Sequence, residues 1–245
     1  MKFLFEIGDV LTEEKYIAEK SVQNPRTDII RIHPEFMSKN RIVLDKKFIP
    51  LGTVNFCSEY MHYMGKHVCP IDYPKELKKY LGREVIFQYG LTAKPTDYVK
   101  PPKTKEFTCD VKSKVEETLG KDLSDTLLWI SEPIKITQEY RVYILNNRIA
   151  GYSRYDDGDE KDILPDFYVI FDMIAAYERT APASYTLDVA LRDTGETVLI
   201  EVNDMWATGF YKWGTMTGEK YLECLQARWY EIVGYTEPFN RPVTI

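Results

Sequence analysis

The chain has 245 residues, of which 44% are hydrophobic and 29% charged, and its formal net charge is −6 at pH 7. This composition is typical of a globular protein with one large domain or two small ones. The acidic balance argues against a general nucleic-acid binder, because such proteins usually carry excess positive charge.

The first ten residues do not resemble a secretion signal, because Glu6 and Asp9 interrupt the only apolar run. No stretch of the sequence approaches the length of a membrane span. The cysteines show no CxxC pair or zinc spacing. We therefore expect a cytoplasmic protein with reduced thiols and no membrane partner. The cysteines are Cys57, Cys69, Cys109 and Cys224.

The first eighty residues predict a small α/β region. Residues 1–7 (MKFLFEI) predict a strand, and residues 41–52 contain another that Pro50 and Gly52 end. The apolar residues of 54–65 recur with a helical period. A domain boundary near residue 80 divides the chain into a region 1–80 and a domain 81–245.

The next segments alternate between strand and helix patterns. Residues 83–90 and 97–101 predict strands, and the polar stretch 103–125 predicts a short helix. Residues 127–156 are β-rich. A helix with one apolar side is expected within 162–179, and another helix within 217–235.

Residues 183–203 predict a second hairpin, with a turn at Thr194-Gly195. A two-residue loop places Asp188 directly opposite Glu201, with Asn203 two residues further along the same face. Like charges in that position destabilise a strand pair, and a divalent cation would offset the repulsion. Mg²⁺ prefers such oxygen ligands, although a solvated strand face carrying two acids is an equally good interpretation.

The earlier hairpin has a turn at Asn146-Asn147. A two-residue loop there pairs Glu139 with Arg154, which is a stabilising contact between opposite charges. The alternative hypothesis is that Arg141 and Arg154 bind phosphate groups. Lys100 ends the strand 97–101, where it is either a solvated charge or a phosphate ligand.

The order of these motifs resembles that of the ATP-grasp superfamily, in particular its small stand-alone bacterial and phage members. The motifs are YVKPPKTKEFTCDV, EYRVYI, LDVAL and LIEVNDMWATGFY. The resemblance covers residues 83–211 and implies an α+β fold in which two α+β subdomains grip ATP, preceded by the small N-terminal region. The loop after Lys100 departs from the family pattern, because it lacks a glycine run.

The resemblance also implies roles for individual residues. Lys100, Arg141 and Arg154 would be catalytic, and Asp188, Glu201 and Asn203 would hold Mg²⁺. The residues implied to contact ATP are Lys100, Lys105, Glu132, Pro133, Ile134 and Glu139.

Most members of the superfamily are ligases, so the resemblance implies an ATP- and Mg²⁺-dependent enzyme that joins a carboxylate to an amine or thiol through an acylphosphate. The substrate would be a small molecule or a peptide. Three alternatives stay open: a kinase that phosphorylates a hydroxyl, a nucleotide-binding module without catalysis, and a metal-dependent phosphoesterase. The sequence does not indicate the substrate or the oligomeric state.

Overall fold

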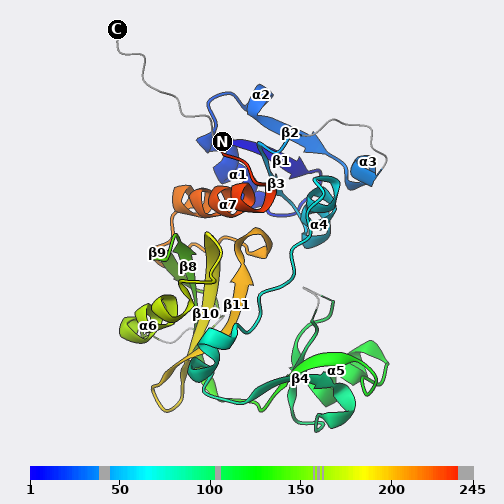
Figure 1. Cartoon of the computed structure of the whole chain (residues 1–245), viewed down its shortest axis with the longest axis vertical. Coiled ribbons are helices and arrows are strands. Elements are labelled where there is room, and N and C mark those ends of the chain that lie inside the picture. The colour runs from blue at the N-terminus through cyan, green and yellow to red at the C-terminus, as the bar shows by residue number, and fades with distance from the viewer. Residues whose placement is uncertain (39–44, 103–105, 157, 159–160, 162, 237–245) are drawn as a thin grey trace.

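The structure is a computed structural model that describes residues 1–38, 45–102, 106–156, 158, 161 and 163–236. Figure 1 shows three parts arranged along the long axis of the molecule. An N-terminal region lies at one end, a four-stranded sheet lies in the middle, and a second four-stranded sheet lies at the other end.

The N-terminal region is built on a parallel sheet of order β2-β1-β3. The strands are β1 (Lys2–Glu6), β2 (Ile29–Ile32) and β3 (Phe48–Leu51). The helices are α1 (Thr12–Ser21), α2 (Pro25–Asp28), α3 (Pro34–Ser38) and α4 (Val54–Tyr63). The expected strand at 1–7 and the expected helix at 54–65 are confirmed; the side chain of Thr53 caps α4 by accepting a bond from the Phe56 amide.

The strand order places a topological switch point between β1 and β3, because β1 leads to β2 on one side while β3 lies on the other. Helix α1 follows β1 and helix α4 follows β3, so both helices begin at the carboxyl edge of the sheet. Open parallel sheets commonly bind ligands in the crevice at such an edge.

The middle sheet is antiparallel, with the order β11-β10-β8-β9. Its strands are β8 (Ile136–Leu145), β9 (Arg148–Arg154), β10 (Ser184–Arg192) and β11 (Thr197–Asp204). Helix α6 (Phe167–Tyr177) covers one face, where Ile170 and Met173 pack with strand residues such as Val142 and Leu187. The side chain of Asp166 caps this helix.

Helix α7 (Gly218–Val233) covers part of the opposite face and also packs against the N-terminal sheet. Its Trp229 ring stacks on Tyr60 of α4 with 5.0 Å between the ring centroids. Tyr143 of β8 shares this core, so α7 covers the Tyr143 end of the face and leaves the Arg141 end to the site described below.

The third part is a sheet of order β4-β7-β5-β6. The strands are β4 (Val85–Tyr89), β5 (Tyr98–Lys100), β6 (Asp110–Val111) and β7 (Leu127–Ser131), with α5 (Lys112–Leu119) and the 3₁₀ turn η2 (Gly90–Thr92) beside them. Val99, Leu128 and Ile130 form its small core with Val115 of α5.

The division at residue 80 remains a prediction. Leu77 and Leu81, at the 3₁₀ helix η1 (Lys75–Tyr80), pack in the same core as helix α6.

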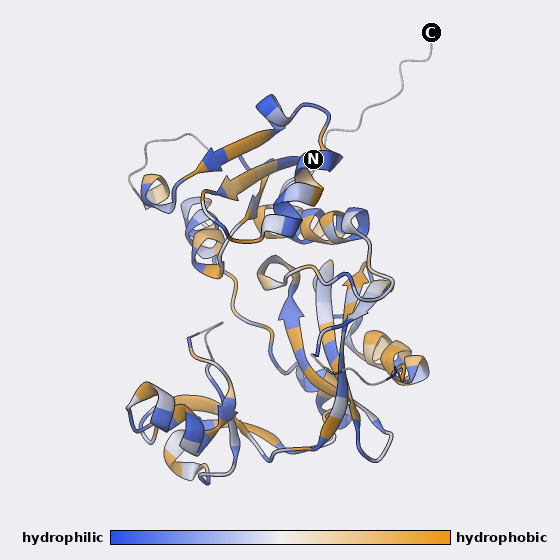
Figure 2. Ribbon diagram, turned by 180° about the vertical axis from the view of Figure 1, so that it is seen from behind, coloured by the Kyte–Doolittle hydropathy of each residue, from blue (hydrophilic) through white to orange (hydrophobic). Residues whose placement is uncertain are grey.

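Figure 2 shows hydrophobic residues concentrated in the strands of the N-terminal sheet and along much of α6. Within the described part of the chain, no helix is both long and apolar enough to cross a membrane.

Both predicted hairpins form, but the register of β8–β9 differs from the prediction. Asn146 and Asn147 make the two-residue turn, with φ values of 48° and 60°. A bulge at Ala150 then shifts the pairing by one residue. The predicted pair of Glu139 with Arg154 is therefore wrong: Arg154 lies opposite Tyr140. The same shift places Arg141 opposite Ser153.

In β10–β11, Asp188 lies opposite Glu201 as predicted. The loop, however, contains three residues, since the Arg192 amide donates to the Glu196 carbonyl and Gly195 has a φ of 85°. A bulge at Ile200 compensates for the extra loop residue. In a strand without a bulge, alternation would place Ile200 on the core face; here Ile200 is partly exposed, and Leu199 is fully buried.

Candidate functional site

Arg141 and Asp188 form the buried base of the site. They lie directly opposite each other on the adjacent strands β8 and β10. The guanidinium of Arg141 donates two parallel bonds to the carboxylate, Nε to Oδ1 at 2.8 Å and a terminal nitrogen to Oδ2 at 2.6 Å. Asp188 is only 1% exposed, so this charge depends on its partner.

Lys100 meets the site from the end of β5, in the other sheet. Its ammonium contacts Oε2 of Glu201 at 2.5 Å and forms an ion pair with Asp72. Burial lowers the pKa of Lys100, but nearby groups, chiefly Glu201, raise it by more, so its net pKa lies above the ordinary value. Lys100 is therefore a firmly charged cation shared by two carboxylates.

Asn203 links the two acids on β10 and β11. Its side-chain nitrogen donates to Oδ2 of Asp188 at 2.9 Å and to Oε1 of Glu201 at 2.8 Å. The three side chains predicted to hold a metal thus converge on one point. Among the described residues, no group of three His, Cys, Asp or Glu side chains is arranged to hold a metal ion, so this set needs the Asn203 amide as its third member.

The prediction that Asp188 and Glu201 repel each other without compensation is wrong, because each acid has a cationic partner: Arg141 for Asp188 and Lys100 for Glu201. Burial raises the pKa of Asp188, and Arg141 offsets this only in part. Burial also raises the pKa of Glu201, but Lys100, with Asn203 and Arg141, lowers it by more, so that its net pKa is below the ordinary value.

Two tyrosines flank the Arg141 guanidinium. Its central carbon lies 5.1 Å from the Tyr155 ring centroid and 5.2 Å from that of Tyr211. The Tyr211 loop is fixed by bonds from its amide to the Tyr143 hydroxyl, at 3.2 Å, and from the Ser153 hydroxyl to its carbonyl. These contacts hold the flat guanidinium in one orientation.

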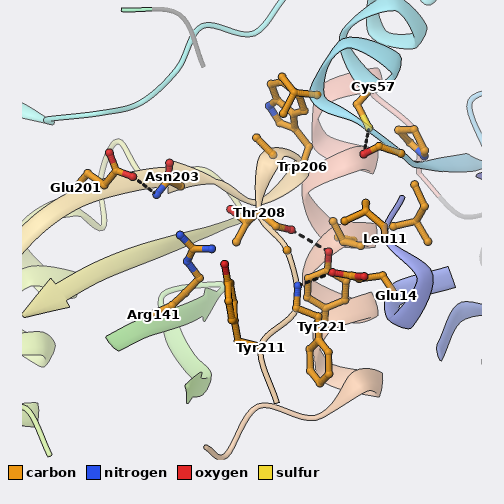
Figure 3. A pocket seen from close by; sticks show the side chains of 18 of the residues that line it. Leu11, Glu14, Cys57, Arg141, Glu201, Asn203, Trp206, Thr208, Tyr211 and Tyr221 are labelled. Carbon is orange, nitrogen blue, oxygen red and sulfur yellow. Dashed lines mark hydrogen bonds between the residues drawn. The ribbon is translucent and has the colours of Figure 1, made fainter. Parts of the chain in front are cut away.

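A cavity of about 790 Å³ opens beside these residues. Lys100, Arg141, Glu201 and Asn203 line one end. Figure 3 shows the other end, where residues of the N-terminal region such as Leu11 and Glu14 face the loop after β11. The cavity therefore connects the charged cluster to the carboxyl edge of the parallel sheet.

The N-terminal end of the cavity is largely apolar. Its lining includes Leu51, Cys57, Trp206, Phe210, Tyr221 and Leu225. Glu14 is the acid of this end among the described lining residues; it is 7% exposed and accepts a bond from the Phe210 amide at 2.9 Å. The aromatic segment after Asn203 both lines this cavity and packs against α7, where Tyr221 donates to the Thr208 carbonyl.

Of the remaining predicted residues, Glu139 borders this cluster, and the others lie away from it or outside the described residues. Glu139 lies on the Arg141 face, bonded to Tyr155, and burial raises its pKa. Arg154 lies on the Tyr140 face and pairs with Asp156 at 2.7 Å. Lys105 lies outside the described residues. Glu132, Pro133 and Ile134 form the connection between β7 and β8, outside the cavity lining.

Asp72, Glu14 and Tyr155 belong to the site but were not predicted. Asp72 lies between Ile71 and Tyr73 in a segment bounded by prolines, which is a weak signal of a buried acid. Glu14 lies in the first turn of α1, where an acid is ordinary. No sequence pattern brings these residues to Lys100 or Arg141, because they come from distant segments.

The family model for "ATP-grasp domain, R2K clade family 3" matches residues 17–232. No curated protein matches the chain. Three similar solved structures cover nearly the whole chain. D-alanine–D-alanine ligase from Bacillus anthracis has a TM-score of 0.57 and 14% identity, covering 96% of this chain and 99% of its own. The macrocyclase MdnC from Microcystis aeruginosa MRC, bound with its precursor peptide MdnA, has a TM-score of 0.52 and 10% identity, covering 96% of this chain and 100% of its own. L-amino acid ligase from Bacillus licheniformis has a TM-score of 0.51 and 11% identity, covering 95% of this chain and 74% of its own.

These structural likenesses concern the fold, since the identities are low. They confirm the expected α+β architecture: an N-terminal parallel α/β region followed by two antiparallel sheets with their helices.

Proposed function

The chain belongs to family 3 of the R2K clade of ATP-grasp domains, and we propose that it is an ATP- and Mg²⁺-dependent ligase that joins a carboxylate to an amine. The observation that carries this proposal is the cavity, which joins a cluster suited to phosphates to an apolar end where Glu14 is the one acid among the described lining residues. A nucleotide-binding module without catalysis would need the first of these ends but not the second, whereas a kinase would use the second end to bind its hydroxyl acceptor.

The acidic cluster fits a magnesium ion. Glu201 and Asn203 line the cavity, and Asp188 lies directly behind them, within 2.9 Å of the Asn203 amide. Carboxylate and amide oxygens are hard ligands of the kind that Mg²⁺ takes. When bound, the ion would neutralise charge on the phosphate oxygens of ATP.

Lys100 and Arg141 would bind the phosphates from two sides. Lys100 presents a compact charge from β5, whereas Arg141 presents a planar group held by Asp188 and the two tyrosine rings. Each comes from a different sheet, so nucleotide binding would join the two sheets. Groups fixed in advance in this way stabilise the charge that develops during phosphoryl transfer.

The proposed reaction has two steps. An oxygen of the substrate carboxylate attacks the γ-phosphorus of ATP, and the bond from that phosphorus to the oxygen bridging the β- and γ-phosphates breaks. ADP departs, and the substrate is now an acylphosphate. The amine then attacks the acyl carbon and expels phosphate, losing a proton as the amide forms. Glu14, at the other end of the cavity, would accept hydrogen bonds from the amine-bearing substrate, a small molecule or a peptide.

Hydroxylamine trapping tests this proposal without knowledge of the natural amine. The protein would be incubated with ATP, Mg²⁺ and hydroxylamine, and with each member of a library of amino acids and peptides. With a carboxylate that is a substrate, the protein should release ADP from ATP and form a hydroxamate, because hydroxylamine captures the acylphosphate. Glu201→Gln is the control and should yield neither product. A stable phosphorylated hydroxyl compound in place of a hydroxamate would favour a kinase.

A further inference from the structure

Asp72 lies in the segment that connects α4 to η1, yet its side chain reaches the charged cluster. One carboxylate oxygen pairs with Lys100, and the other accepts a bond from the indole nitrogen of Trp129 at 3.1 Å. The residue is 7% exposed. Its two oxygens are thus held by groups from β5 and β7, which belong to the same sheet.

The backbone of Asp72 is also fixed, and in an unusual conformation. Its φ is +56°, and its carbonyl accepts the amide of Val202 at 2.8 Å, in the strand that carries Glu201 and Asn203. The other described non-glycine residues with positive φ are the two asparagines of the β8–β9 turn and Leu11, which lines the cavity. Strained backbone of this kind is often retained where a site needs it.

Lys100 and a cation bound by Glu201 would compete for one carboxylate. The ammonium is 2.5 Å from Glu201, and a like charge on the same oxygens would repel it. A buried ammonium that loses its only anion is costly. Asp72 gives Lys100 a second carboxylate, so Lys100 can release Glu201 and remain paired.

We propose that Asp72 is a positioning residue that keeps Lys100 paired when Glu201 takes up Mg²⁺, and that it thereby sets the Mg²⁺ dependence of nucleotide binding. The inference rests on the proposed function, since it assumes that ATP and Mg²⁺ bind this cluster. It differs from a purely structural role, in which Asp72 would only tie the connecting segment to β11.

The test is Asp72→Asn, followed by the ATP-induced shift in melting temperature over a range of Mg²⁺ concentrations. Asparagine tolerates positive φ, and its amide oxygen can still accept the Trp129 bond. The substitution therefore removes the charge and little else. The Mg²⁺ concentration that gives half of the shift should rise about tenfold, because Glu201 is then the one anion paired with Lys100 among the described residues.

Two further variants accompany it. Trp129→Phe keeps the ring contacts with Tyr73 and Phe87 but removes the bond that orients Asp72, so the half-point should move in the same direction by less. Asp166→Asn is the matched control, because it removes an aspartate charge at the cap of α6 and leaves a good capping residue. Its half-point should equal that of the wild type.

The outcomes separate the two proposals. If the wild type shifts with ATP and Mg²⁺ while Asp72→Asn shows the same half-point, the role of Asp72 is overturned and the ligase proposal stands. If Asp72→Asn does not fold, an unchanged half-point in Trp129→Phe overturns it instead. A wild type that shows no shift with ATP at any Mg²⁺ concentration overturns both.

Discussion

The β8–β9 and β10–β11 hairpins lie in one sheet, and each departs from a regular ladder at one bulge. In β8–β9 the turn has the predicted length, and the bulge at Ala150 moves Arg154 away from Glu139. In β10–β11 the loop is one residue longer than predicted, and the bulge at Ile200 restores the pairing at the site. The same kind of irregularity thus moves one arginine off the site face and keeps two acids opposed.

The strand register at a site therefore depends on the length of the turn and on every bulge between the turn and the site. Turn residues leave a signal in the sequence, whereas a bulge leaves little, since many residues can occupy one. The confirmed pairing of Asp188 with Glu201 therefore depended on two deviations that cancel. The sharpest tests of the comparison use residues that the two registers place differently.

The largest effect is expected for the two acids of β10–β11. Asp188→Asn and Glu201→Gln should each lower Mg²⁺-dependent turnover by about 100-fold or more, because both remove charge from the proposed metal site. ADP release measures this effect. Their melting temperatures should differ, however: Asp188→Asn leaves the buried Arg141 unpaired, at a cost of about 3–5 kcal/mol.

Glu201→Gln should remain close to the wild type in thermal stability, because Lys100 keeps Asp72 as a partner. The pair of variants separates the metal site from the ion pair beneath it. Unchanged turnover in Glu201→Gln would remove the proposed metal site.

The second prediction compares the two arginines that the registers place on opposite faces. Arg141→Lys keeps the charge but loses the two parallel bonds to Asp188, and turnover should fall by about 100-fold. Arg154→Lys should leave the ATP-induced melting shift unchanged, because Arg154 lies on the Tyr140 face. Equal losses of turnover in both variants would show that Arg154 reaches the substrate.

Several elements could be predicted because their signal is local. The helix 54–65 follows from apolar spacing, and the Asn146-Asn147 turn follows from residues that tolerate positive φ. The clustering of Asp188, Glu201 and Asn203 follows from alternation along one hairpin.

The rest of the site depends on contacts between distant segments. The pairing of β8 with β10 brings Arg141 to Asp188, and the connecting segment brings Asp72 to Lys100. Helix α7 packs on the N-terminal sheet although more than 150 residues of sequence separate them. Spacing in one sequence carries no information on such pairings, so neither the pairing of the two acids with Lys100 and Arg141 nor the place of Glu14 in the site could be predicted.

The third prediction concerns the bulge of β10–β11, which Arg83 holds by donating to the carbonyls of Leu199 and Ile200, each at 3.0 Å. Arg83→Ala should lower the free energy of unfolding by about 1–3 kcal/mol, as expected for lost bonds to a charged group. Denaturant unfolding measures this change. Arg192→Ala is the matched control in the same hairpin; it removes an ion pair with the exposed Glu196 and should cost under about 1 kcal/mol. Equal costs would mean that Arg83 does not stabilise the bulge.

The smallest effect is expected for Asp156, which holds Arg154 on the other face. Burial raises its pKa, but bonds from Arg154 and from the amides of Glu139 and Gly158 lower it by more, to about 2 from an ordinary 3.8. A depressed folded-state pKa gives stability that is present above pH 3.8 and is lost as the pH falls towards 2.

Asp156→Asn should therefore lower the melting temperature by about 2–4 °C at pH 7, a modest change because the carboxylate is partly solvated. Between pH 4 and pH 2 the variant and the wild type should converge, while the ATP-induced shift at pH 7 stays the same. A difference that persists at pH 2 would show that Asp156 acts through packing and not through its charge.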